Sequence, residues 1–353
     1  MLRIEKINKK IGKFTLNNID FTVDKGDYFV LIGESGAGKS MLLEVITGLL
    51  IPDSGKIFLN VKDQQNTPVQ NRKIGIVYQK PTLFPHMSVF ENISYPLKIK
   101  KLSKNEIIKQ VNQLAEDTEI SHLLNRNIAN LSGGEAQRVT IARTLATKPD
   151  ILLLDEPLSF LDVQLKRGMT SLLRKINQSG QTIIHVTHDY DEAVSLTNKI
   201  AIIENGTIIQ TGTPQEVFQN PKSIFVANFI GIRNFFKGRL LKAKDQSESK
   251  VFEINGISIF VLSEEDENVL GNITITSESI IISEEKIESS AINNFFGTIK
   301  EIYETKLGFE VLVDIGIDIS VQISRQSLDH LKLKINKEIW ISFKASSVSF
   351  IKN

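Results

Sequence analysis

The chain lacks several features that would each point to a class of protein. It has no cysteine, which excludes disulfides and cysteine-ligated metals. It has no excess of one charge, since 42 basic and 41 acidic residues leave a net charge of +1, unlike the clearly basic domains that bind nucleic acids. It also has no long apolar run and no apolar signal core near its N-terminus, so we expect a cytoplasmic protein without a transmembrane segment.

The first 230 residues alternate apolar strands with amphipathic helices. Four runs are continuously apolar, as in strands covered on both faces: 28–32, 73–78, 151–155 and 182–187. Alternation in FTLNNIDFTV (14–23) predicts an antiparallel pair with one buried face. Helices are predicted over 163–176 and over 103–117, the latter with an apolar stripe of Ile107, Ile108, Val111, Leu114 and Ala115. This order predicts an α/β domain with a mostly parallel sheet, helices and an antiparallel β part.

After about residue 230, short β-branched segments alternate with turns, which predicts an all-β, OB-like domain. Its two halves resemble each other: NFFKGRLLKA (234–243) resembles NFFGTIKEI (294–302), and GNITITSESIIIS (271–283) resembles IWISFKASSVSFI (339–351). We therefore predict two domains, 1–230 and 231–353, the second made of tandem repeats over about 231–285 and 290–353.

The stretch GESGAGKS (33–40) fits the phosphate-loop pattern G-x-x-x-x-G-K-[ST] between a strand and a helix. Its glycines let backbone N–H groups face an anion, while the lysine adds charge near the β- and γ-phosphates and the serine offers a hydroxyl to Mg²⁺. A simple glycine-rich turn would not require that lysine and serine. The predicted nucleotide-binding residues are Gly33, Glu34, Ser35, Gly36, Ala37, Gly38, Lys39 and Ser40.

Polar side chains follow the other buried strands. ILLLDEP (151–157) ends its strand in Asp155 and Glu156. Because the carboxyl ends of parallel strands share one edge of a sheet, we expect Asp155 to hold Mg²⁺ there and Glu156 to deprotonate the attacking water. His188 is expected to reach the γ-phosphate, and Gln79 to position water and Mg²⁺.

The stretch LSGGEAQR (131–138) predicts a helix start, since Ser132 and Glu135 have the spacing of a capping box. A cap does not need Gly133 and Gly134, and glycine weakens a first helical turn. A helix N-terminus with bare backbone is also an anion site, so this stretch predicts a second phosphate-binding element.

The motifs GESGAGKS, Gln79, LSGGEAQR, ILLLDEP, SFLD (159–162) and HVTHD resemble, in this order, those of ATP-binding-cassette ATPases. The resemblance implies hydrolysis of ATP with Mg²⁺ by a head-to-tail homodimer on the cytoplasmic face of a membrane. It also implies that Ser132, Gly133 and Gly134 bind the γ-phosphate of ATP held by the partner's Lys39, with Asp162 at the dimer seam. Integral-membrane permease subunits, and through them an extracytoplasmic substrate-binding protein, are the implied partners.

The second domain is similar to the oxyanion-binding tail of molybdate and tungstate importer ATPases, on the segments GIRNFFKG (231–238), SSAINNFFG (289–297), VQISRQSL (321–328) and FKASSVSFI (343–351). A tetrahedral dianion needs hydroxyl, backbone and cationic donors. The predicted regulatory residues are Arg233, Ser290, Lys344, Ser346 and Ser347.

Alternatives stay open at this stage. The cargo can instead be sulfate, iron, a polyamine or a sugar, and the second domain can be a rigid dimerisation element that binds nothing. A soluble, non-transport ATPase of the same family is a further alternative, although such proteins usually carry two cassettes or long coiled-coil insertions. Either Ile11 or Phe14 is expected to contact adenine.

Overall fold

The computed structural model describes residues 1–242, 249–305 and 308–352, and residues 243–248, 306–307 and 353 of the two predicted repeats lie outside the described residues. The chain forms two compact units, Met1–Val217 and Phe218–Asn353. This division precedes the predicted boundary near residue 230, and it assigns α8 (Ile224–Phe229) to the second unit. Residues 222–224 line a cavity together with side chains of that unit, in agreement with this assignment.

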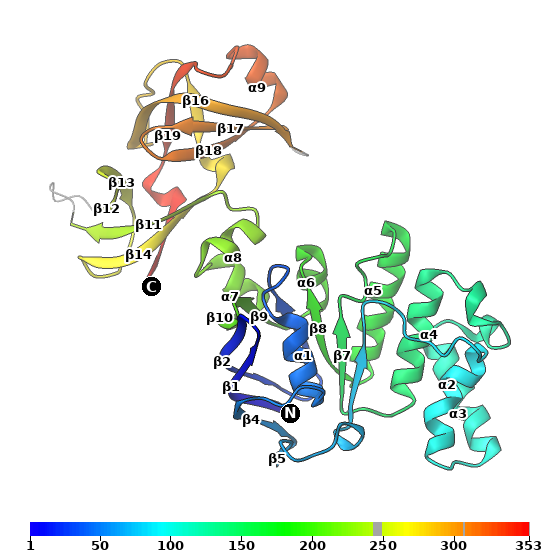
Figure 1. The fold of residues 1–353 in the computed structure, drawn as a ribbon. Coiled ribbons are helices and arrows are strands. Elements are labelled where there is room, and N and C mark those ends of the chain that lie inside the picture. The colour runs from blue at the N-terminus through cyan, green and yellow to red at the C-terminus, as the bar shows by residue number, and fades with distance from the viewer. Residues whose placement is uncertain (243–248, 306–307, 353) are drawn as a thin grey trace. The chain divides into compact units, whose positions relative to one another are not determined.

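The first unit contains two sheets and a group of helices (Figure 1). Its strands are β1 (Leu2–Ile11), β2 (Phe14–Val23), β3 (Tyr28–Ile32), β4 (Ser54–Leu59), β5 (Lys62–Asp63), β6 (Ile74–Val77), β7 (Ile151–Asp155), β8 (Thr182–Thr187), β9 (Lys199–Glu204) and β10 (Thr207–Gly212). Its helices are α1 (Lys39–Thr47), α2 (Val89–Ile99), α3 (Lys104–Asp117), α4 (Gly133–Leu145), α5 (Val163–Gln178), α6 (Tyr190–Leu196) and α7 (Pro214–Gln219), the last of which runs into the second unit. No helix in the described part of the chain combines the length and apolar character needed to cross a bilayer.

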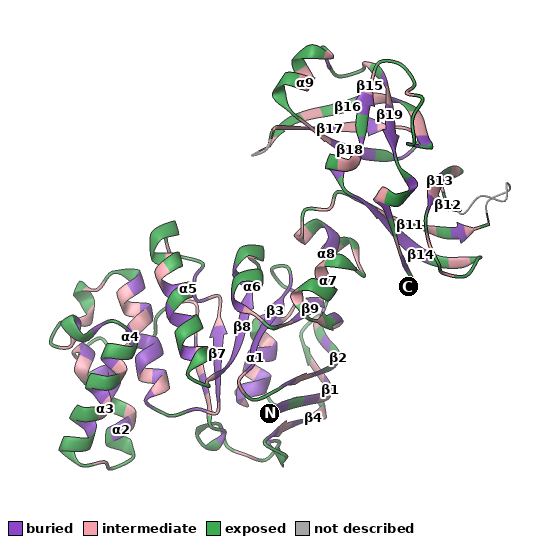
Figure 2. Cartoon of the chain, turned by 180° about the vertical axis from the view of Figure 1, so that it is seen from behind, coloured by how far each residue is buried: buried purple, intermediate pink, exposed green. Residues whose placement is uncertain are grey.

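The main sheet has the strand order β10-β9-β3-β8-β7-β6, and only β10 runs antiparallel to its neighbour. Strands β3 and β8 are buried along their whole length, as their continuous apolar runs predict, and Figure 2 shows them in purple. The second sheet, β2-β1-β4-β5, is antiparallel and includes the predicted pair at 14–23. The parallel order brings the carboxyl ends of β3, β6, β7 and β8 to one edge.

Helix α3 confirms the predicted helix but corrects its apolar stripe. Ile107, Val111 and Ala115 are buried at i, i+4 and i+8, and Leu114 packs partly against the same cluster. Ile108, however, is 48% exposed, because one step along a helix turns a side chain by about 100° from its neighbour. The three buried residues join α2 and α4 in a separate small core.

The second unit consists of two five-stranded sheets. Its strands are β11 (Asn234–Leu241), β12 (Lys250–Ile254), β13 (Ile257–Val261), β14 (Val269–Ile275), β15 (Ile281–Ser283), β16 (Asn293–Thr305), β17 (Gly308–Asp314), β18 (Asp318–Ile323), β19 (Glu338–Phe343) and β20 (Val348–Lys352). Its helices are α8 and α9 (Arg325–His330), and 3₁₀ turns at Ser277–Ser279 and Ala345–Ser347 occupy matching places in the two repeats.

The two repeats exchange their last strands. The first sheet has the order β13-β12-β11-β14-β20, and the second has the order β15-β19-β16-β17-β18. Strand β15, from the end of the first repeat, therefore pairs with β19 of the second, while β20 pairs with β14 of the first. Both sheets enclose one shared hydrophobic core, so neither repeat completes its sheet alone.

Two buried asparagines join the repeats reciprocally at their edge strands. Asn234 of β11 donates to the Ser320 carbonyl and accepts from the Ser320 N–H, both at 2.7 Å, on edge strand β18. Asn293 of β16 makes the same pair of bonds with Phe260 on edge strand β13, at 2.9 and 2.7 Å. Each side-chain amide thus substitutes for a neighbouring strand and satisfies backbone groups that would otherwise be unpaired.

We expect Asn234→Ala to loosen β18 because it leaves the N–H and carbonyl of Ser320 without partners in a buried place. The local free energy of opening should fall by about 2 kcal/mol, which corresponds to roughly thirtyfold faster amide exchange at Ser320. Hydrogen exchange on the full chain measures this directly. Asn294→Ala is the control, since Asn294 contacts Ala291 and Ser342 instead; equal exchange in both variants would contradict the role of Asn234.

Candidate active site

The predicted phosphate loop lies between β3 and α1, and its glycines are required for two different reasons. Gly36 and Gly38 have φ angles of 84° and 101°, in the left-handed region that favours glycine. Gly33 instead lies against β9, where an added Cβ would come within 2.4 Å of the Ile203 carbonyl oxygen. Gly38 caps α1 without a side-chain hydrogen bond, so the N-terminus of that helix stays open for an anion.

Lys39 is buried at the start of α1 and is held by the loop itself. Its ammonium donates to the carbonyls of Gly33 and Glu34 at 2.8 and 2.9 Å. Burial lowers its pKa, against the opposing charges of Glu156 and Asp155. Carbonyl partners of this kind can be exchanged for phosphate oxygens without moving the helix.

Asp155 ends β7 beside Ser40 of α1. The Ser40 hydroxyl donates to an Asp155 carboxylate oxygen at 3.3 Å. Burial is the main cause that raises the pKa of Asp155, and a nearby cation would counteract it. Hydroxyl and carboxylate oxygens are ligands that Mg²⁺ prefers, so the donor set fits this ion. Among the described residues no cluster of three His, Cys, Asp or Glu could hold a metal, so phosphate and water oxygens would have to complete the shell.

Glu156 is held between Gln79 and His188, as expected for side chains from three neighbouring strand ends. The Gln79 amide donates to one carboxylate oxygen at 3.1 Å, and His188 Nδ1 lies 3.2 Å from the other. Glu156 also has a φ of 44°, an uncommon value for a residue with a side chain. Such strain is typical of residues whose position matters for function.

Ser132 and Glu135 form the predicted capping box at the start of α4. A Cβ added to Gly133 would meet nothing within 4 Å, so the packing of this subunit does not demand glycine there. Asp162 caps α5 by accepting from the N–H groups of Gln164 and Leu165. In the described residues, no hydrogen bond or ion pair joins Ser132, Gly133, Gly134 or Asp162 to the phosphate loop.

The predicted regulatory residues fall into two groups in the second unit. Arg233 lies 3.7 Å from the buried carboxylate of Glu310. Ser290 precedes β16, whose Asn293 pairs with Phe343, so it lies near the same ladder end as Lys344. Ser346 follows in the adjacent 3₁₀ turn and lines a cavity of about 670 Å³ together with three acidic residues. Within the described residues no hydrogen bond or ion pair joins Arg233 to the other four.

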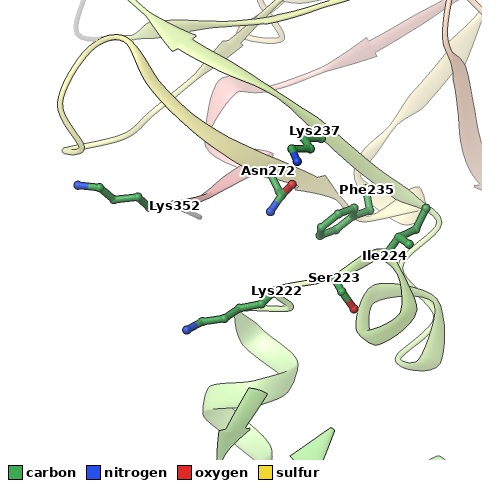
Figure 3. A pocket seen from close by; sticks show the side chains of 7 residues that line it. All are labelled: Lys222, Ser223, Ile224, Phe235, Lys237, Asn272 and Lys352. Atoms are coloured by element: carbon green, nitrogen blue, oxygen red, sulfur yellow. The ribbon is translucent and has the colours of Figure 1, made fainter. Parts of the chain in front are cut away.

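A separate cavity of about 580 Å³ lies in the second unit, over strands β11, β14 and β20 of its first sheet (Figure 3). It is lined by Lys222, Ser223, Ile224, Phe235, Lys237, Asn272 and Lys352. This cavity is not visible in the sequence, because its residues come from four separate segments. Lys222 and Lys352 point away from it in Figure 3, and Lys352 pairs with Glu265 at 2.9 Å.

The sequence analysis also missed the contacts of Lys166 and Glu192 behind His188. Lys166 contacts Asp189 and Glu192. No local pattern in the sequence signals this arrangement, since it joins α5 to α6 through the tertiary fold.

Comparison with known proteins shows two family matches. The ABC transporter family matches residues 16–159, and the TOBE domain family matches residues 289–350. The first match contains the phosphate loop and both strand-end carboxylates. The second contains the later repeat of the β unit.

Similar curated proteins match nearly the whole chain. The molybdate/tungstate import ATP-binding protein of Pyrococcus abyssi is 39% identical over 99% of both chains. That of Thermococcus kodakarensis is 42% identical over 84% of this chain and 87% of the relative. The spermidine/putrescine import ATP-binding protein of Thermotoga maritima is also 39% identical, over 96% of this chain and 95% of its own.

Solved structures match the first unit. CbiO1 from Clostridium perfringens, part of an ABC transporter complex, has a TM-score of 0.59 and 33% identity, over 64% of this chain and 94% of its own. A dimeric ATP-binding cassette in a post-hydrolysis state with ADP and phosphate has a TM-score of 0.55 and 29% identity, over 60% of this chain and 98% of its own.

Proposed function

The chain belongs to the ABC transporter family of import ATP-binding proteins, and from this premise we propose that it hydrolyses ATP to drive uptake of molybdate or tungstate. The placement of Glu156 between Gln79 and His188, at the sheet edge that carries Lys39, is the observation that supports hydrolysis best. Relatives of nearly equal length that are named for molybdate and tungstate import support the cargo.

In the proposed reaction, the loop from Gly33 to Ser40 binds the phosphates of ATP, and Lys39 exchanges its two carbonyl partners for phosphate oxygens. Glu156 accepts a proton from the attacking water, while Gln79 and His188 keep its carboxylate in place. Ser40, Gln79 and Asp155 would hold Mg²⁺, which neutralises charge on the phosphates when bound.

Ile11 is our choice for the residue that contacts adenine. Its side chain is 44% exposed on β1, whereas Phe14 packs partly against the core. The Phe14 ring also lies where a Cβ on Gly38 would approach within 2.8 Å, so it supports the phosphate loop. Apolar contact from an isoleucine is weaker than aromatic stacking on a base.

We propose that the active form is a head-to-tail homodimer in which Ser132, Gly133 and Gly134 bind the γ-phosphate of ATP on the partner. The open space beside Gly133 supports this, because a phosphate needs close access to backbone N–H groups. Asp162 would lie at the seam between subunits. A relative of known structure, described as a dimer with ADP and phosphate, supports such an assembly.

Permease subunits would dock on a groove of about 990 Å³ beside α2 and α4. Its wall includes Phe84, Tyr95 and Arg143, and the guanidinium of Arg143 lies 4.9 Å from the Phe84 ring. One guanidinium nitrogen, Nη1, is buried without a hydrogen-bond partner in the described structure, which suits an acceptor on an inserted segment. Docking would hold the chain at the cytoplasmic face of the membrane, with an extracytoplasmic binding protein delivering cargo and no role for nucleic acid.

We also propose that oxyanion bound to the second unit inhibits transport, through Arg233, Ser290, Lys344, Ser346 and Ser347. Arg233 lies in the first repeat and the other four residues lie in the second, which supports two sites rather than one. Import of a polyamine is the second candidate function, because the Thermotoga maritima relative is as similar as the molybdate/tungstate relatives.

Calorimetry of the full chain with molybdate tests the cargo class and the regulatory site together. We expect binding that Lys344→Ala weakens about tenfold or more, because a charge-assisted hydrogen bond is lost. Lys237→Ala, in the separate cavity of Figure 3, is the matched control and should bind as the unchanged chain does. Binding of spermidine but not molybdate would favour the polyamine alternative, and equal losses in both variants would contradict the assignment of Lys344.

A further inference from the structure

A network of charged side chains lies directly behind the loop that carries His188. The ammonium of Lys166, on α5, is 2.6 Å from an Asp189 carboxylate oxygen and 2.7 Å from a Glu192 carboxylate oxygen. The side chains of Lys166 and Asp189 are about one-third exposed, whereas that of Glu192 is 5% exposed. Lys166 of α5 therefore bridges two carboxylates of a different helix: that of Asp189, which caps α6, and that of Glu192, which lies within α6.

Glu192 is built into the core of the unit. Its second carboxylate oxygen accepts from the Thr187 hydroxyl at 2.7 Å and lies 3.4 Å from His185 Nε2. His185 is fully buried and its Nδ1 lies 3.0 Å from the Tyr28 hydroxyl. Burial alone would raise the pKa of Glu192, but His185, Lys166 and Thr187 together lower it to about 2. The carboxylate is thus a fixed negative charge that needs a cation.

The network connects two functional segments. Lys166 lies in the first turn of α5, where its N–H bonds to the carbonyl of Asp162, the predicted seam residue. Asp189 directly follows His188 and caps α6 by accepting from the Glu192 N–H at 3.0 Å. The Asp189 N–H in turn donates to Thr187 at 3.0 Å, so the loop is fixed on both sides of its exposed histidine.

We propose that Lys166 is a positioning residue that ties the start of α5, at the dimer seam, to the loop that places His188 against Glu156. The inference rests on the proposed function, since Asp162 senses the partner only in the dimer. Without the ammonium, the carboxylates of Asp189 and Glu192 would face each other as like charges. The loop would shift to separate them, and His188 would lose its 3.2 Å contact with Glu156.

The expected consequence is a loss of turnover without a loss of nucleotide binding. Lys166→Ala should lower kcat for ATP about ten- to hundredfold, because small displacements at a reacting centre have effects of this size. The Kd for ATP should stay within about twofold, since the phosphate loop is untouched. Lys166→Arg should recover most of the rate because a guanidinium can still bridge both carboxylates.

A double-mutant cycle with His188→Ala separates positioning from a general structural role. If Lys166 acts through His188, then Lys166→Ala should cause little further loss in the His188→Ala background. Lys175→Ala is the matched control, since Lys175 is on the same helix and pairs with Glu119 away from the site. Should Lys166→Ala fold poorly, Lys166→Gln, which removes the charge but keeps an N–H donor group, takes its place in the cycle.

Three results would overturn the proposal. Lys166→Ala could hydrolyse ATP at a rate within twofold of wild type, or it could cause the same loss of rate in the His188→Ala background as in wild type. The control Lys175→Ala could also lose as much rate as Lys166→Ala. Each rate is measured relative to wild-type hydrolysis on the full chain. Failure of the proposed function would appear separately, as absent hydrolysis in the wild type or retained hydrolysis in Glu156→Gln.

Discussion

Glu156→Gln should reduce steady-state ATP hydrolysis about 10²- to 10⁴-fold, the range over which general-base catalysis contributes. The amide has nearly the same shape as the carboxylate, and it can accept from Gln79 while donating to His188. It cannot take a proton from water. The site should therefore assemble and bind ATP but not turn it over.

Single-turnover hydrolysis measures the loss of turnover, and size-exclusion chromatography with ATP measures whether the dimer still assembles. We expect ATP to stay bound and the dimer to accumulate, because the nucleotide that joins the two subunits is not consumed. Glu119→Gln is a matched control, since Glu119 pairs with Arg138 and Lys175 at the surface. Retained turnover in Glu156→Gln would remove Glu156 from the role of base.

Gly133→Asp should abolish hydrolysis while leaving the isolated subunit at least as stable. Within the subunit the new side chain enters open space, and a carboxylate in the first turn of α4 stabilises the helix by about 0.3–1 kcal/mol. In the closed dimer the same carboxylate would face the γ-phosphate of the partner's ATP. Repulsion there should cost at least about 100-fold in rate, comparable to the loss of an anion-stabilising donor.

The control for this substitution is Asn105→Asp, which adds the same charge to the first turn of α3, a helix with the same Ser-Glu capping box. It should leave hydrolysis unchanged.

Mixed dimers test the cross-subunit geometry: Gly133→Asp in one subunit paired with Lys39→Ala in the other places both defects in one site and leaves the other intact. Recovery of hydrolysis supports the shared site, whereas an inactive mixture would mean that Gly133 acts on its own subunit's nucleotide.

The sequence predicts which side chains meet at the carboxyl edge of the main sheet, because each contribution there is local. An apolar strand precedes the turn GESGAGKS and a helix starts at its end, and a buried strand ending in carboxylates is visible in ILLLDEP. Parallel order then brings Lys39, Asp155 and His188 to one edge, since strand ends of this kind have only one place to meet.

Features that depend on packing between distant parts of the chain cannot be recognised in the sequence as these local motifs can. The bridge from Lys166 to Glu192 joins residues on two helices, and each residue alone is typical of an exposed helical surface. Ile108 shows the reverse error, because its apolar character suggested burial that the turn of α3 does not provide. The repeat in the second unit was visible, but similarity between segments does not reveal which sheet each strand joins.

The exchange of β15 and β20 also governs how the protein can fold during synthesis. Strand β14 ends at Ile275, but its neighbour β20 begins only at Val348. At roughly 5–20 residues per second, the ribosome needs about 4–15 s to make the intervening segment. Throughout that interval the nascent first repeat presents an unpaired strand edge on β14.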